Sequence, residues 1–542
     1  MLAPDLVLLN GHILTVDSAN GVAEGVAMFG GRIVAVGKTR DVSAMAGRST
    51  KVIDLGGRTV LPGLTDPHVH LADFGTEDLF TIDCRDFYTN IRTLDSLLER
   101  IRLQTHETPA GEWIKAQGSP MQDFRMPEGR FPDRHDLDRA APEHPVMMGF
   151  GAHLAIVNSK ALEVLGIGED IQPPFGGRIE RDAAGRVTGR FYERAQYLVR
   201  KPIGQFKVEQ KKLGILDAAE KCLARGVTTI HDIAADPETV RAYQELLNEG
   251  RLPLRVSLLV RVVESKIGSD NLLGLGLTTG FGNEWLRLGG VKMSIDGGAT
   301  GHLSAFSQPY HDDPCNTGLL RIASDELDDV TSRYHQAGHR ICIHAMGDVA
   351  MDMALNSLGR TIDAHPRDDH RHRIEHMGNW MVTGERIETM RRLGIIPVPN
   401  IAFGYYLHDS LSAMLGPERM AEFMNLRTMM EAGLPVTSGS DGPSYWPVDI
   451  LRDLGLAVSR RTRTGGRFVE SEAITRNDAL RMMTTNAAYC GFEEKIKGSI
   501  EVGRLADMVV LAEDPMSVAT DHIQDIGVDL TIVNGRVAYA RH

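Results

Sequence analysis

The chain has little that would suit it to bind nucleic acid or to enter a membrane. Lys and Arg number 59 against 72 Asp and Glu, so the formal net charge is −13. Binding to a phosphate backbone needs clustered Lys and Arg, and no such patch occurs. The longest apolar run, LGIIPVPNIAFGYYL at 393–407, contains two prolines and is too short to span a bilayer. We therefore expect neither a nucleic-acid partner nor a membrane partner.

Cysteine is also scarce. The five cysteines are scattered, without Cys-x-x-Cys spacing, which favours reduced thiols in a cytoplasm over a disulfide framework. The first residues, MLAPDLVLLNGHILTVDS, have no basic region before the apolar ones, and Asp5 interrupts them. A signal peptide is therefore not expected, and we predict a soluble cytoplasmic protein.

Both ends of the chain consist of short alternating apolar runs broken by glycine. DLVLLNGHILTV and GRIVAVG near the start, and DLTIVNGRVAYAR near the end, are typical of β-hairpins. The Asn-Gly pair at 534–535 favours a two-residue turn. We predict one small β-sandwich built from residues 1–60 plus 485–542.

The middle of the chain alternates apolar strands with helical patterns, as parallel βα units do. Eight strand candidates lie at 60–70, 227–232, 253–261, 288–296, 339–347, 372–377, 395–402 and 434–441. Eight units are the number that closes a (β/α)8 or TIM barrel. The fold class predicted is therefore α/β, with residues 61–484 forming the barrel.

The first two strand candidates are separated by a connection far longer than an ordinary βα loop. Residues 75–205 are therefore predicted to be an insertion at the C-terminal face of the barrel, where active sites lie. A cap over the substrate is its natural function. Trp113 and His153 in this insertion are candidates for contact with a small-molecule substrate, although packing beneath the cap would also explain the tryptophan.

One short motif poses a chemical question. In LPGLTDPHVHL (61–71), His68 and His70 are two residues apart at the end of a strand, so both imidazoles would point the same way. Two convergent imidazoles suit a divalent metal ion. The alternative is a strand end with two polar residues facing solvent.

Other polar residues recur at the ends of the later strands. They are Lys292, His344, His376 and Asp441. Strand ends converge on one mouth in a barrel, so these side chains and the first two histidines could hold one or two divalent ions. Taken singly, each histidine could be a hydrogen-bonded core residue, and Asp441 in GSDGP could begin a turn.

Several of these segments resemble the amidohydrolase superfamily. They are PGLTDPHVH, VKMSIDGGATG, CIHAMGD, RIEHM, SGSDGP and the segment TTNAAYCGFEEKIKGSIEVGRLADMVVL. Together with HPVMMGFGAHLAIVNSKAL in the insertion, they are similar to the branch that contains N-substituted formamide deformylases. The resemblance covers nearly the whole chain and implies a metal-dependent hydrolase.

The resemblance also implies roles for single residues. His68 and His70 would hold one metal ion, and His344 and His376 the other. Lys292 would be a bridging ligand after N6-carboxylation, because a carbamate is anionic whereas an ammonium cannot ligate a cation. Asp441 would be both a ligand and the general base. Zinc is the expected metal, with one or two ions per chain, and Lys292 could instead remain an ammonium paired with Asp441 or Asp296.

Parts of the chain depart from that family pattern. WIKAQGSPM around Trp113 lacks the second aromatic and the acid of the usual segment, and His302 lies in the unusual sequence IDGGATGHLSAF. Both segments would line the mouth of the barrel, so the family pattern does not identify the substrate. His231 and His302 are further candidates for substrate contact, although His231 is better explained as an orienting hydrogen-bond partner.

The function predicted from these features is hydrolysis of a C–N bond, most simply an amide, N-acyl or N-formyl bond. Water activated by the metal would attack the carbonyl, and Asp441 would accept the proton. Two alternatives stay open. One is a lyase, isomerase or decarboxylase on the same scaffold, and the other is a non-catalytic barrel protein. The oligomeric state is also open, a homo-oligomer included.

Overall fold

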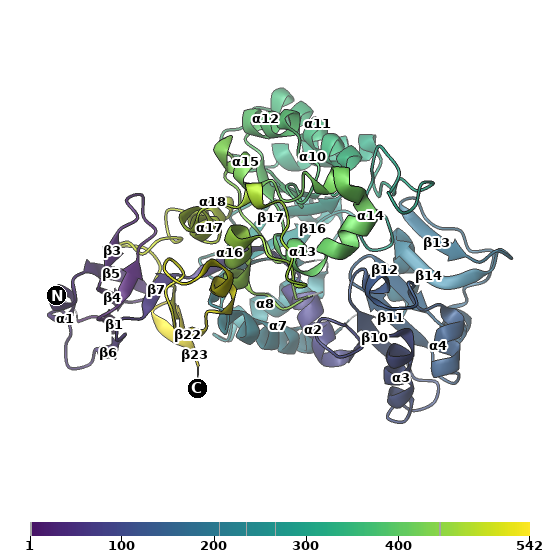
Figure 1. Ribbon diagram of the computed structural model, residues 1–542, viewed down its shortest axis with the longest axis horizontal. Coiled ribbons are helices and arrows are strands. Elements are labelled where there is room, and N and C mark those ends of the chain that lie inside the picture. The colour runs from purple at the N-terminus through teal and green to yellow at the C-terminus, as the bar shows by residue number, and fades with distance from the viewer. Residues whose placement is uncertain (1–2, 205, 235, 266, 444–445, 542) are drawn as a thin grey trace.

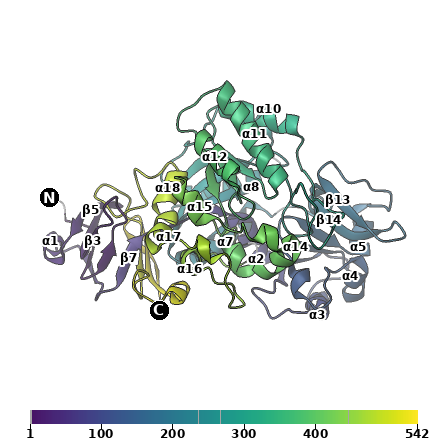
Figure 2. The ribbon, with the colours of Figure 1, turned by 45° about the horizontal axis from the view of Figure 1, so that its top comes forward.

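A computed structural model of the chain describes residues 3–541 except 205, 235, 266, 444 and 445. Its three parts lie in a row: a β-sandwich at one end, a barrel in the middle and an inserted α/β unit at the other end (Figure 1). The same order is seen after a 45° turn (Figure 2). Within the described residues, no helix has the length and apolar character needed to cross a bilayer.

The barrel sheet contains seven parallel strands. In spatial order they are β20 (Ile396–Val398), β19 (Arg373–Glu375), β18 (Ile341–His344), β17 (Leu286–Ser294), β16 (Arg255–Arg261), β15 (Val227–Ala234) and β8 (Leu64–Val69). The helices of this part of the chain include α2 (Leu71–Phe80), α7 (Val208–Leu223), α8 (Pro237–Asn248), α10 (Ser324–Gln336), α11 (Asp348–Ala364), α12 (Gly384–Leu393), α16 (Ile450–Ser459), α17 (Arg476–Met482) and α18 (Thr485–Cys490). The predicted α/β barrel is confirmed.

The eighth predicted strand, 434–441, is not a regular strand. The segment still lies between the two ends of the sheet, because Gly439 N donates to Pro399 O at 3.1 Å and Asp441 N donates to His68 O at 2.9 Å. Asp441 has a φ of +58°, which extended strands do not adopt. The chain therefore closes the barrel here with isolated backbone hydrogen bonds, supplemented by side-chain ones such as Ser440 N to Asp66 Oδ1, instead of a ladder.

Strands from both ends of the chain share one sheet of the sandwich. Its order is β23 (Arg536–Ala540), β22 (Val528–Val533), β21 (Met508–Leu511), β7 (Thr59–Pro62), β2 (His12–Leu14) and β3 (Val22–Ala23). The other sheet comprises β5 (Arg32–Gly37), β4 (Gly25–Phe29), β1 (Leu6–Leu9) and β6 (Lys51–Asp54). Asn534 and Gly535 have φ values of +53° and +72°, as the predicted two-residue hairpin turn requires.

The long connection between β8 and β15 forms a separate six-stranded sheet. Its strands are β13 (Gly177–Arg181), β14 (Val187–Glu193), β12 (Leu154–Val157), β11 (Val146–Phe150), β10 (Ile114–Gly118) and β9 (Ile82–Asp83). Helices α3 (Leu94–Thr105), α4 (Arg134–Ala140) and α5 (Ser159–Leu165) belong to the same unit. We refer to this unit as the cap.

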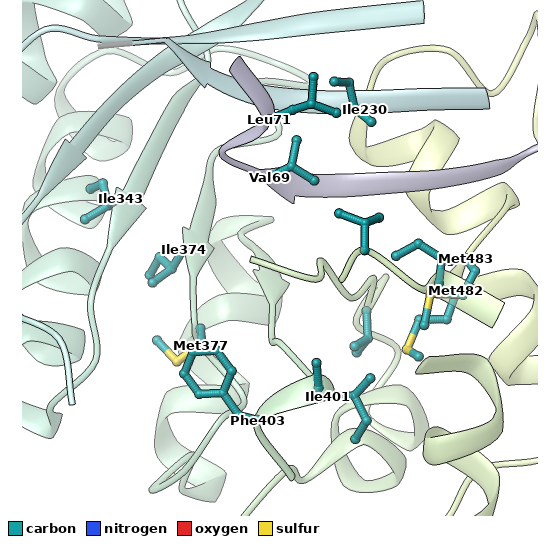
Figure 3. Close-up of a cluster of buried hydrophobic side chains, with 14 of the residues drawn as sticks. Val69, Leu71, Ile230, Ile343, Ile374, Met377, Ile401, Phe403, Met482 and Met483 are labelled. Atoms are coloured by element: carbon teal, nitrogen blue, oxygen red, sulfur yellow. The ribbon is translucent and has the colours of Figure 1, made fainter. Parts of the chain in front are cut away.

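The barrel strands alternate apolar and polar residues near their carboxyl ends. Val69 lies between His68 and His70, Ile343 precedes His344, and all three histidines line a pocket. Val69, Ile343, Ile374 and Met377 belong instead to the large buried hydrophobic cluster of the barrel (Figure 3). Burial of these neighbours fixes the strands and so orients the polar side chains between them.

Candidate active site

A pocket of about 250 Å³ lies at the carboxyl ends of the barrel strands. The barrel contributes the six side chains that the sequence predicted to gather there: His68, His70, Lys292, His344, His376 and Asp441. The cap contributes others, among them Lys115, Met147 and His153. The pocket therefore lies between the barrel and the cap, and its size suits a small molecule.

Asp441 is at the centre of one half of this group. Its Oδ1 atom lies 3.3 Å from His68 Nε2 and 3.3 Å from His70 Nε2. Ligand atoms of His68, His376 and Asp441 all lie within 4.8 Å of one another, and all three residues are buried. Two imidazole nitrogens and a carboxylate at this spacing can bind one divalent ion.

His344 and Lys292 form the other half. The His344 and His376 ring centroids are 4.5 Å apart, and Lys292 is paired in register with Cys342, two residues before His344. His344 Nε2 and Lys292 Nζ are buried and make no hydrogen bond to a described residue, whereas His68 Nε2 has the Asp441 carboxylate at 3.3 Å. Buried polar atoms without partners are costly in a folded protein. A bound cation would satisfy the imidazole nitrogen of His344, and Lys292 could ligate the same cation only as a carbamate.

Burial tunes the protonation of these groups. It lowers the pKa of His376 to about 3 and the pKa of Lys292 to about 8, and it holds the pKa of His344 well below its usual range. Burial alone would raise the pKa of Asp441, but the adjacent His68 and His70 reverse that effect and hold it well below its usual value. The neutral imidazoles of His344 and His376 and the ionised carboxylate of Asp441 are the forms that ligate a metal.

Two of these residues have strained backbones. His376 and Asp441 have φ values of +69° and +58°, in the left-handed region that side chains other than glycine seldom adopt. Such strain persists only where the surrounding structure enforces it, and it clusters at functional sites.

The sequence did not predict two residues that orient the candidate ligands through hydrogen bonds. Glu375 accepts a hydrogen bond from His68 Nδ1 and is paired with Arg373, and Asn400 Oδ1 lies 2.7 Å from His376 Nδ1. Each partner occupies the ring nitrogen that faces away from the pocket, as orienting groups do at metal sites. The signal was a polar residue inside an apolar strand segment: RIEHM for Glu375 and IIPVPNIA for Asn400.

The weaker substrate candidates have different positions. His153 lines the pocket, lies 2.7 Å from Glu193 through Nδ1 and has its ring centroid 5.9 Å from that of His344. Trp113, His231 and His302 are not among the lining residues. Trp113 packs against a hydrophobic cluster of the cap.

His231 is fully buried and lies 3.1 Å from Arg373 Nη1 through Nδ1. Since Arg373 holds Glu375, His231 is connected to the site only through other side chains. His302 Nε2 lies within hydrogen-bond distance of the Asp312 carboxylate, at 3.0 Å.

Known proteins are similar to this chain in sequence and in fold. The model of the amidohydrolase family matches residues 51–539. The chain belongs to the amidohydrolase family. An N-substituted formamide deformylase of Arthrobacter pascens is 30% identical over 99% of this chain and 98% of its own length. The putative amidohydrolase YtcJ of Bacillus subtilis is 28% identical over 91% of each chain.

Two solved structures resemble the chain over almost its full length. An uncharacterized metal-dependent hydrolase from Pyrococcus horikoshii has a TM-score of 0.75 and 25% identity, covering 95% of this chain and 99% of that one. Another, from Pyrococcus furiosus, has a TM-score of 0.72 and 26% identity, with 94% and 100% coverage. The predicted resemblance to amidohydrolases, and to the deformylase in particular, is confirmed.

Proposed function

We propose that this member of the amidohydrolase family is a metal-dependent hydrolase that cleaves an amide, N-acyl or N-formyl C–N bond of a small molecule. The observation that carries the proposal is the buried group of His68, His376 and Asp441 at the floor of the pocket. The likeness to a deformylase over 99% of the chain supports the type of bond.

The residues of the pocket fit a divalent cation, and we propose zinc because the donors are mainly imidazole nitrogens. His68, His70, His376 and Asp441 would hold one ion, with His344 and Lys292 beside a second. When bound, zinc lowers the pKa of a coordinated water to near neutral and polarises a carbonyl. Lys292 would contribute as a carbamate, which its desolvated amine, with a pKa of about 8, makes chemically accessible.

Asp441 would act as the proton carrier. Its ionised carboxylate accepts the proton of the attacking water and then delivers it to the leaving nitrogen, so that the C–N bond breaks with a neutral amine departing. The cap lines one side of the pocket, and His153 is placed to contact the substrate from that side.

The test is a panel of N-formyl, N-acyl, urea and carbamate compounds, assayed with zinc-loaded protein for release of an amine. Release of amine with stoichiometric formate or carboxylate supports the proposal. Release of carbon dioxide without hydrolysis of the C–N bond would favour a decarboxylase instead, and no turnover of any compound by zinc-loaded protein would favour a binding protein.

A further inference from the structure

The charges that line the pocket are unequal. Besides the candidate metal ligands, six cationic residues line it among those that the structure describes: Lys115, Arg200, Lys201, Lys211, Arg261 and Arg321. Only four carboxylates do so: Asp73, Glu77, Asp236 and Glu264. A pocket with excess positive charge favours an anionic ligand.

The four carboxylates already have partners within the protein. Lys211 pairs with Asp73 and Asp236, and Arg200 lies 3.6 Å from Glu77. Arg321 pairs with Glu264 and also with Glu193, which lies outside the lining. Each carboxylate of the pocket is therefore ion-paired with a cation other than Lys115, Lys201 and Arg261.

Three cations remain: Lys115, Lys201 and Arg261. No ion pair joins any of them to another residue in the part of the chain that the structure describes. Lys115 and Lys201 lie over the rings of Phe206 and Tyr197, with Nζ 5.4 Å and 5.3 Å from the ring centroids. They belong to the cap side of the pocket, where they can attract an approaching anion.

Arg261 lies deeper, on the barrel. It is the last residue of β16 and is paired in register with Lys292 on β17, so its backbone is one strand away from the candidate metal site. Its side chain lines the pocket, and its Nε atom is buried without a hydrogen-bond partner. A buried guanidinium N–H without an acceptor is unfavourable, and a ligand anion beside the candidate metal site would supply that acceptor.

We propose that Arg261 binds a carboxylate of the substrate, so that the enzyme acts on N-acyl or N-formyl compounds that carry a carboxylate close to the scissile bond. This inference rests on the proposed function and names its substrate class. The planar guanidinium can donate two parallel hydrogen bonds to a carboxylate, which a lysine cannot do. The two lysines on the cap side add attraction without fixing orientation.

Two compounds that differ only by the carboxylate provide the test: N-formylphenylalanine and N-formylphenethylamine. We expect the zinc-loaded wild-type enzyme to have a higher kcat/KM for the acid. Arg261→Met should lower the ratio of the two kcat/KM values by roughly 10- to 100-fold, the usual worth of charged hydrogen bonds. The change should fall mainly on KM, and Arg261→Lys should restore part of the ratio.

Arg251→Met is the matched control. Arg251 is an exposed arginine that precedes the first residue of β16, at the end of the strand away from the pocket, and it pairs with Glu249 at 3.0 Å. It should leave the ratio unchanged. Zinc content and circular dichroism of each variant establish that the fold and the metal site persist. Equal losses for both compounds on Arg261→Met, or an unchanged ratio, would overturn the inference.

Calorimetric binding separates this inference from the proposed function. If neither compound is hydrolysed, but N-formylphenylalanine binds wild type more tightly than its neutral partner and loses that advantage in Arg261→Met, the carboxylate site stands and the proposed activity falls. If both compounds are hydrolysed and bind equally well, the activity stands and the carboxylate site is refuted. Equal or absent binding of the two compounds by wild type likewise refutes the carboxylate site.

Discussion

The carboxylate of Glu375 accepts a hydrogen bond from His68 Nδ1 across the barrel, although the two residues are 307 positions apart in the chain. Glu375 is in turn held by Arg373, which also donates to Pro67 O beside the histidine. The pairing leaves Nε2 of His68 as the atom that faces the pocket. The orientation of this imidazole is therefore built into the barrel interior before any ligand arrives.

Glu375→Gln should weaken metal binding without removing a ligand. The amide keeps the shape of the carboxylate but not its charge, so His68 loses basicity and orientation, and we expect metal affinity to fall by roughly 10- to 100-fold. Loss of the ion pair with Arg373 should also lower the melting temperature. A competitive chelator titration measures the affinity. Glu385→Gln is the control, because Glu385 is exposed on helix α12. Unchanged affinity would show that the hydrogen bond does not orient the ligand.

Lys292 is predicted to act as an anion. Lys292→Ala should lose metal and activity together, and added formate or acetate should restore part of both by supplying the missing oxygen ligand. Lys292→Arg keeps a positive charge but cannot form a carbamate. Full activity of that arginine variant would exclude carboxylation.

Asp441→Asn separates the ligand role of this residue from its proton transfer. Asparagine keeps the shape and one oxygen but is a very poor base, so kcat should fall by roughly two to four orders of magnitude. The variant should stay folded and retain metal, as elemental analysis and circular dichroism would show. Asp325→Asn, on the exposed first turn of α10, is the control. Turnover near the wild-type rate would place the proton transfer elsewhere.

Removal of the metal should destabilise the protein as well as inactivate it. Binding to the folded state alone contributes about 2.7 kcal/mol when free ion is 100-fold above its Kd. Dialysis against a chelator should therefore lower the melting temperature, and zinc should restore both melting temperature and activity. Elemental analysis should approach two ions per chain, whereas one ion with full activity would contradict the bridged arrangement.

Acid should weaken the fold through a histidine cluster at the opposite end of the barrel. His335 Nδ1 lies 2.7 Å from His372 Nε2, and His372 Nδ1 accepts from Ile341 N, so these rings are arranged as neutral tautomers. His370 Nδ1 accepts from His372 N, and burial lowers the pKa of His370 from 6.5 to about 4. As the pH falls, His370 is protonated in the unfolded chain before it is protonated in the folded protein. Its contribution to the free energy of unfolding is therefore complete above pH 6.5 and is lost as the pH drops toward 4.

His370→Asn should reduce that pH dependence, because the amide oxygen can accept the same hydrogen bond and does not titrate. Protonation of His370 in acid lowers the free energy of unfolding of the wild-type protein by at most about 3 kcal/mol. Melting temperatures between pH 4.5 and 7.5 measure it, with His106→Asn at the exposed end of α3 as the control. Parallel curves for wild type and His370→Asn would refute the assignment.

The sequence predicted the barrel well because its strands are apolar segments that end in polar residues. Val69 between His68 and His70 shows why: the same alternation that buries one side chain exposes its neighbours to the pocket. The last strand was predicted less well. The left-handed backbone of Asp441 is imposed by the surrounding structure, and the modest preference of aspartate for this conformation is too weak to predict it.

The cap and the orienting residues were harder to predict for another reason. Whether Trp113 faces the pocket or the cap core depends on how the inserted sheet is placed against the barrel, which is a long-range contact. Glu375 was missed because its partner, His68, is on a distant segment of the chain. Spacing within one strand therefore indicates ligands, whereas their supporting contacts need the tertiary fold.

The sandwich that joins the two ends of the chain has a consequence for biosynthesis. Strand β7 pairs along one edge with β21, so that Val60 is opposite Val510. On the ribosome, β7 is made early and its partner emerges only after the entire barrel and cap. That edge therefore stays open to other chains throughout translation. The barrel and cap can fold before β21 is synthesised, and the last step of assembly is then the pairing of the C-terminal strands with β7.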